Sequence, residues 1–228
     1  MIVSHKHRFI FLKTKKTAGT SIELALCRLC GPEDIITPVT PEDEMLRDGL
    51  GPQNWRRHSW WGSPRPIWKR RWFKLGPPDY GYYNHMVAAE VADYIGPEIW
   101  SSYFKFAFDR NPWDRQVSHY HFRHRGWRRP PTFAEFLDKD RRARLNNYEI
   151  YSLGGAPCVD FLGRFENLTE DLARALKAVG IDEKLQLPRA KASHRPSRPY
   201  QEYYDERTKA LVADWYRNEI GLLDYSFR

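Results

Sequence analysis

A buried strand, a loop of lysine, hydroxyl and small residues, and a helix follow one another near the N-terminus, and this order constrains the fold more than any other feature. Residues 9–12 are an apolar run that predicts a strand, and residues 22–26 carry the spacing of a helix over about 20–30. Between them, residues 13–21 read Lys-Thr-Lys-Lys-Thr-Ala-Gly-Thr-Ser. Amides at the start of a helix, the helix dipole and a lysine charge all attract anions, so the segment predicts a phosphate-binding loop.

The loop does not have the spacing of common ATPases and GTPases. Their loops place two glycines on either side of four residues, followed by Lys-Ser or Lys-Thr, whereas this loop contains Gly19 alone. Because the pattern is short, a surface turn with solvated lysines is the alternative interpretation. A second segment of the chain favours the phosphate-binding loop over the surface turn.

That second segment lies in the middle of the chain. Residues 103–108 predict an aromatic strand, and Arg110 follows directly where this strand ends. Pro112 is placed to begin a helix over about 112–125, and Ser118 lies two turns beyond Arg110. An arginine in this position suits a phosphate because its planar guanidinium binds two oxygens at once.

Together, Lys-Thr-Ala-Gly-Thr-Ser at 16–21 and Arg-Asn-Pro-x-x-Arg-x-x-Ser at 110–118 resemble the sulfotransferases that use 3′-phosphoadenosine 5′-phosphosulfate (PAPS). The closest resemblance is to the branch of carbohydrate and small bacterial sulfotransferases. The similarity continues in order through residues 84–86, 97–100, 163–168 and 203–227, and leaves out about 35–80. It implies that the first loop holds the 5′-phosphosulfate and that Arg110 and Ser118 hold the 3′-phosphate.

The remaining pattern predicts one α/β domain over 1–228, with a central parallel sheet flanked by helices and a P-loop-like phosphosulfate loop. Strands are expected at 7–13, 103–108 and 159–165, and further helices at 85–95, 168–179 and 202–219. Strands that alternate with helices form parallel sheets, whose ligands bind beyond the carboxyl ends of the strands. Both anion-binding segments begin at such an end, so we expect them to share one edge.

The resemblance assigns the donor site residue by residue. It implies that the donor contacts include Thr17, Ala18, Gly19, Thr20, Ser21, Arg110 and Ser118. We expect three further donor contacts, from Lys15 in the same loop and from Lys191 and Arg195 in a loop that closes over the nucleotide. Lys16 matches the family lysine that stabilises the leaving phosphate oxygen, and a lysine there replaces a metal, so no metal is expected. Relatives commonly have proline where this chain has Lys15, which leaves Lys15 and Lys16 as alternatives for the lysine that faces the sulfate, with Lys13 a more distant one. An ion pair with Asp109 or Asp114 is the alternative role for Arg110, and we expect Arg115 to pair with an acid.

A general base is needed because the acceptor hydroxyl loses its proton during transfer, and histidine suits this task near neutral pH. His85 begins a predicted helix where carbohydrate sulfotransferases place a candidate base, and a helix N-terminus lowers the pKa of a histidine. His58 is the second candidate. A hydrogen bond to the backbone at a helix start is the purely structural alternative for His85.

Basic and aromatic residues alternate in two stretches of this chain, whose net charge is +8. Residues 55–74 hold seven Arg or Lys and five Trp without an acid, and we expect an irregular insertion at about 51–80 in which His58, Trp60 and Trp61 contact the acceptor. The second cluster comprises Arg123, Arg125, Arg128 and Arg129 around Trp127. Such surfaces suit carbohydrates that carry acidic groups, and equally suit single-stranded nucleic acid.

Three cysteines make an odd count, which argues against a disulfide framework, and Cys27-x-x-Cys30 lacks a second pair of metal ligands. We expect packed thiols. The apolar run near the N-terminus is too short for a signal peptide or a membrane span, which predicts a cytoplasmic protein without a membrane span. The oligomeric state is not predicted.

The sequence therefore predicts a sulfotransferase that moves the sulfuryl group from PAPS to a hydroxyl of a carbohydrate or glycoconjugate, releases the 3′,5′-bisphosphate PAP, and has no nucleic-acid partner. Two alternatives stay open. A phosphotransferase would bind Mg²⁺ through Asp109 or Asp160. A nucleic-acid-binding protein would use the Trp/Arg stretch as a stacking surface.

Overall fold

A mixed sheet of five strands, in the order β3-β1-β2-β4-β7, forms the centre of the computed structural model, which describes residues 1–56, 81–188 and 196–228. The strands are β1 (Ile2–Ser4), β2 (Phe9–Leu12), β3 (Ile35–Ile36), β4 (Phe104–Asp109) and β7 (Phe161–Arg164). The expected acceptor contacts His58, Trp60 and Trp61 and the expected donor contacts Lys191 and Arg195 lie outside the described residues.

The three predicted strands are confirmed, and they pair in parallel. In the register of the sheet, Phe11 lies opposite Phe106, and Phe108 lies opposite Gly163. The prediction of a parallel sheet is wrong at one edge, because β1 and β3 run antiparallel to their neighbours. β1 is joined to β2 by a four-residue turn, and so short a connection permits only antiparallel pairing.

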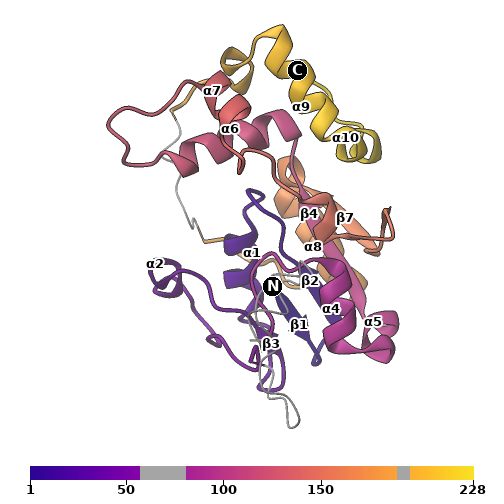
Figure 1. Ribbon diagram of the computed structural model, residues 1–228. Coiled ribbons are helices and arrows are strands. Elements are labelled where there is room, and N and C mark those ends of the chain that lie inside the picture. Colours follow the sequence, from indigo (N-terminus) through magenta and orange to yellow (C-terminus); the bar gives the residue numbers. More distant parts are fainter. Residues whose placement is uncertain (57–80, 189–195) are drawn as a thin grey trace, which may run out of the picture.

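Helices cover both faces of the sheet (Figure 1). The larger ones are α1 (Gly19–Leu26), α4 (Ala88–Ile95), α5 (Pro97–Ser102), α6 (Pro112–Arg123), α7 (Phe133–Lys139), α8 (Leu168–Ala178), α9 (Glu206–Trp215) and α10 (Arg217–Leu223). The shorter elements are α2 (Pro41–Glu44), the hairpin of β5 (Ser152–Leu153) and β6 (Ala156–Pro157), and three turns of 3-10 helix, η1 (Tyr148–Ile150), η2 (Phe165–Asn167) and η3 (Tyr200–Tyr203). The single helix expected over 202–219 is divided between η3, α9 and α10.

Three buried clusters hold these layers together. One face of the sheet packs on α1 and α8, the other packs on α4, and a third cluster joins α6 to α7, α9 and α10. Phe108 of β4 lies so close to β7 that a Cβ at Gly163 would stand 2.4 Å from its ring, so glycine is required there. Figure 1 shows α6, α7, α9 and α10 gathered past the carboxyl end of β4. The loop after β2 faces this edge.

Candidate functional site

The loop between β2 and α1 presents backbone amides at the start of a helix. Lys16 and Ala18 adopt left-handed conformations, with φ of 65° and 57°, and Ala18 is the N-cap residue of α1. Among the described residues, no side chain caps this helix, and its first turn contains no acid. The first amides of α1 therefore lack an intrahelical acceptor and are suited to an anion.

Glycine is required where α1 begins. A Cβ at Gly19 would lie 2.8 Å from Cγ of Lys13 and 3.2 Å from the carbonyl oxygen of Thr14. The missing side chain thus lets the helix start directly against the end of β2. The hydroxyls of Thr20 and Ser21 follow in the first turn and are buried.

Two threonine hydroxyls fasten the loop to the neighbouring strand. Thr14 donates its hydroxyl hydrogen to the carbonyl of Phe108 in β4, and its oxygen lies 2.7 Å from the hydroxyl of Thr17. Because Thr14 has one hydrogen, Thr17 is the donor in the second bond. The hydroxyl of Thr17 thus holds the loop, and we expect its backbone amide to make any ligand contact.

The three lysines of the loop have different surroundings. Lys13 is buried, and its Nζ lies 2.5 Å from Oε2 of Glu23 and 3.1 Å from Oδ1 of Asn84. Lys16 is half-buried, and its Nζ lies 4.1 Å from the centre of the Phe122 ring. The Lys13 ammonium is therefore paired with Glu23 beneath the loop, whereas Lys16 extends toward α6. The side chain of Lys15 is half-buried.

His85 lies against the same loop, but it does not begin a helix. That prediction is wrong: α4 starts at Ala88 with Val87 as its N-cap, and the φ of 62° at His85 is incompatible with a helix. Nδ1–H of His85 donates to the carbonyl of Lys13 over 2.9 Å, so the neutral ring carries its lone pair on Nε2. Burial, followed by the charge of Lys13, lowers the pKa of His85 to about 3.

Arg110 follows β4 and reaches the loop. Its guanidinium makes an ion pair with Asp114 at 2.6 Å and lies 4.0 Å from the centre of the Phe165 ring. Nη1 donates to the carbonyl of Lys16 over 3.4 Å, although the two residues are 94 positions apart. The ion pair with Asp114, the alternative role for Arg110, is thus present and holds the Nε/Nη2 edge, while Nη1 faces the loop.

Helix α6 contacts Arg110 through Asp114 and Lys16 through Phe122, and Ser118 lies between these two contacts. Asp114, Ser118 and Phe122 are spaced four residues apart and form one stripe along the helix. Arg110 contacts the first of them and Lys16 the last. The stripe therefore places Ser118 toward the loop.

A buried polar cluster beneath both segments was not predicted from the sequence. Asp109, at the end of β4, accepts hydrogen bonds from Arg115, from the amide of Arg110 at 2.8 Å and from the hydroxyl of Tyr151 at 2.8 Å. Arg115 also pairs with Glu219 at 3.2 Å, which confirms the expectation of an acidic partner. Asn147 completes the cluster and contacts Lys15.

A family model described as the sulfotransferase family matches residues 1–226. The chain belongs to the sulfotransferase family. It is also 32% identical over 104 residues to an uncharacterised protein of Archaeoglobus fulgidus, a match that covers 44% of this chain and 87% of that protein. No solved structure gives a significant match.

The carboxylates that a magnesium-dependent phosphotransferase would need have other partners in this sulfotransferase. Asp109 is fully buried against Arg115, and Asp160 pairs with Nζ of Lys105 at 3.0 Å. The part of the chain that the structure describes holds no group of three or more His, Cys, Asp or Glu residues arranged to bind a metal.

The three cysteines are free thiols, and they differ in burial. Cys27 and Cys30 are buried free thiols, as expected, and burial raises the pKa of Cys27 to about 11. Cys158 is a half-buried free thiol. Within residues 1–56, 81–188 and 196–228, no helix has the length and apolar character to cross a bilayer.

Proposed function

We propose that this sulfotransferase transfers the sulfuryl group of PAPS to a hydroxyl of its acceptor, with the 5′-phosphosulfate on the loop after β2 and the 3′-phosphate on Arg110 and Ser118. The observation that carries the proposal is the contact between the two motifs, in which Nη1 of Arg110 reaches the carbonyl of Lys16. They meet where the adjacent parallel strands β2 and β4 end. A nucleotide with anions on both its 5′ and 3′ carbons matches a site of this kind.

The local electrostatics fit such a donor. The first amides of α1, Lys15 and Lys16 supply positive charge on one side, and the guanidinium of Arg110 supplies it on the other. Asp114 orients this guanidinium from its far edge without neutralising the loop. Lys191 and Arg195 remain further proposed donor contacts.

The proposed reaction is an in-line displacement at sulfur. The bond from sulfur to the 5′-phosphate oxygen breaks as the bond to the acceptor oxygen forms, through a loose transition state like that of phosphoryl transfer. Lys16 stabilises the negative charge that grows on the leaving phosphate oxygen. Nε2 of His85 removes the acceptor proton, because Nδ1–H is held by the Lys13 carbonyl.

The low pKa of His85 belongs to the protein without its donor. Burial and the charge of Lys13 both favour the neutral ring, which keeps the base deprotonated at neutral pH. A bound polyanion opposes the lysine charges and raises the pKa of the histidine. We therefore expect His85 to become a stronger base when the donor is bound.

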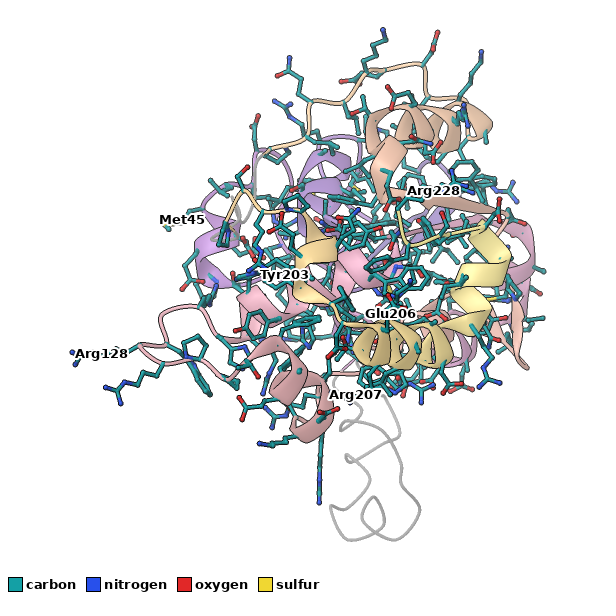
Figure 2. The ribbon with its side chains drawn as sticks, turned by 90° about the horizontal axis from the view of Figure 1, so that it is seen from above. Met45, Arg128, Tyr203, Glu206, Arg207 and Arg228 are labelled. Carbon is teal, nitrogen blue, oxygen red and sulfur yellow. The ribbon has the colours of Figure 1, made fainter. Side chains whose placement is uncertain are left out.

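A carbohydrate with acidic groups is the proposed acceptor. Phe122, which carries the Lys16 ammonium on its ring, is 40% exposed, and Trp127 nearby in the chain is 59% exposed. The guanidinium of Arg125 lies 5.1 Å from the Phe122 ring, and Figure 2 shows Arg128 extending away from the molecule. Flat rings beside guanidinium groups suit sugar rings with carboxylate or sulfate groups. His58, Trp60 and Trp61 remain proposed acceptor contacts.

Calorimetric titration with PAP, 5′-AMP and ATP tests the donor assignment. We expect selective binding of PAP without added metal, and loss of this selectivity in Arg110→Ala. Transfer of labelled sulfate from PAPS to a panel of neutral and acidic oligosaccharides then tests the acceptor. A preference for ATP with Mg²⁺ contradicts the proposal and favours a phosphotransferase.

A further inference from the structure

The side-chain amide of Asn147 binds both main-chain polar groups of Lys15. Its Oδ1 accepts a hydrogen bond from the Lys15 amide over 2.9 Å, and its Nδ2 donates to the Lys15 carbonyl over 2.9 Å. The side chain is fully buried and lies 132 residues from Lys15 in the sequence. It belongs to neither anion-binding motif and comes directly before η1.

The same carboxamide also contacts the second motif. Nδ2 of Asn147 lies 3.4 Å from Oδ1 of Asp109, and that oxygen accepts the amide hydrogen of Arg110 at 2.8 Å. Two side chains, one carboxamide and one carboxylate, thus connect the backbone of Lys15 to the backbone of Arg110. Arg115 and Tyr151 fix the carboxylate in turn.

The conformation of the loop explains why such support is needed. Lys16 and Ala18 are left-handed, which is unfavourable for residues that carry a Cβ. The bonds to the N–H and C=O of Lys15 fix the two successive peptide groups that lead into the first of these residues. A loop that binds an anion through its amides depends on the orientation of each peptide plane.

We propose that Asn147 is a positioning residue that sets the loop in its anion-binding conformation and, through Asp109, fixes its place relative to Arg110. The inference rests on the proposed function, since it takes the 5′ anion of the donor to lie on this loop. It predicts that loss of Asn147 impairs recognition of the 5′ anion and spares recognition of the 3′ anion. A merely structural role predicts no such difference.

The test compares wild type, Asn147→Ala and Asn147→Asp by calorimetric titration with three probes: PAP, 5′-AMP and 3′-AMP. We expect Asn147→Ala to weaken PAP and 5′-AMP by about tenfold, the usual effect of one or two lost hydrogen bonds, and 3′-AMP by less than about twofold. Asn147→Asp keeps the acceptor for the Lys15 amide but loses both donated bonds and places a second carboxylate beside Asp109. We expect it to weaken PAP at least as much.

Ser4→Ala is the matched control. Ser4 is buried and donates to Asp34 over 2.8 Å, at the opposite end of the sheet from the loop, where it pairs with Phe9 at the start of β2. The Ser4→Ala variant is expected to have a lower melting temperature than wild type and an unchanged affinity for all three probes. Equal weakening of all three probes in Asn147→Ala, or PAP affinity within about twofold of wild type, overturns the inference.

Hydrogen exchange of the ligand-free protein separates this inference from the proposed function. We expect faster exchange of the amides of residues 15–19 in Asn147→Ala, with unchanged exchange in β4. If the wild-type protein fails to bind PAP, the proposed donor is wrong. Slower exchange of the loop amides in wild type than in Asn147→Ala still supports the positioning role in that case. Unchanged exchange in the loop overturns the positioning role, whatever PAP does.

Discussion

The loop after β2 and the segment after β4 both follow a buried parallel strand, but they present their anion-binding groups differently. The loop relies on backbone amides, and its threonine and carboxamide contacts hold the backbone in place. The segment after β4 relies on side chains, since Arg110 is oriented by Asp114 and Ser118 lies on the same stripe of α6. The first motif therefore depends on backbone conformation, and the second depends on individual side chains.

The largest expected effect is a loss of turnover in a variant of the first motif that largely keeps its affinity for PAP. In Lys16→Ala, we expect sulfuryl transfer to fall by about 10²–10³-fold, because charge on the leaving oxygen is no longer stabilised. PAP affinity is expected to fall by about tenfold or less, since the amides of the loop remain. Steady-state kinetics and titration measure both effects. Lys15→Ala is the matched variant, and a greater loss of turnover there identifies Lys15 as the lysine that faces the sulfate.

A second substitution tests the dependence of the other motif on one side chain. Arg110→Ala is expected to weaken PAP by roughly 30–150-fold, the effect of losing charge-assisted hydrogen bonds of about 2–3 kcal/mol in total. Binding of 5′-AMP is expected to change little, because that nucleotide has no 3′-phosphate. Titration of both ligands measures the difference. Equal weakening of PAP and 5′-AMP places Arg110 at another part of the nucleotide.

A substitution at Gly19 tests how far the first motif depends on the conformation of its backbone. In Gly19→Ala the new Cβ meets Lys13 and the Thr14 carbonyl, so we expect a loss of about 1–3 kcal/mol in unfolding free energy and about tenfold weaker PAP binding. Gly221→Ala is the control, because a Cβ on Gly221 in α10 meets nothing within 4 Å. Chemical denaturation and titration measure both variants. Wild-type affinity in Gly19→Ala contradicts the close approach of the loop to β2.

One largely buried neutral histidine lies near each motif, and the protonation of these two residues is expected to affect the stability of the fold. Burial lowers the pKa of His119 on α6 to about 4, and that of His85 to about 3, whereas an unfolded histidine titrates near 6.5. The unfolded chain therefore binds more protons below that pH. The contribution of these two histidines to the unfolding free energy should be constant above about pH 7 and fall as pH drops from 6.5 toward 4, by about 1 kcal/mol per unit for each histidine.

Denaturation at pH 7.5, 5.5 and 4.5 measures this dependence. His119→Gln retains a donor for the carbonyl of Arg142, which His119 contacts at 2.9 Å, and removes the titrating group. We expect a shallower pH dependence in this variant than in wild type. Parallel curves for the two proteins show that His119 is not the source of the dependence.

The correct sequence-based predictions of the fold came from apolar runs within single segments of the chain. The parallel strands and the helices that follow them have strong apolar runs and clear ends, so their existence was predictable. β1 and β3 contain three and two residues, and they exist because they pair with each other and with β2. Short strands of this kind have no pattern of their own, which is why the mixed character of the sheet was missed.

The residues of the candidate site also differ in whether the local sequence predicts them. The segments around Lys16 and Arg110 were found because each combines a motif with the end of a strand. His85 was found by resemblance, but its surroundings were wrong, since a left-handed residue and a carbonyl contact replace the expected helix start. Asn147 has no local signal, because its partners lie 132 and 38 residues away.

The crystal structure of the complex with PAP tests the central claim most directly. We expect the 5′-phosphate within hydrogen-bond distance of the amides at the start of α1, and the 3′-phosphate on Arg110 and Ser118, so that one nucleotide joins the two motifs. A nucleotide bound with both phosphates on one motif, or bound away from the edge where β2 and β4 end, contradicts it.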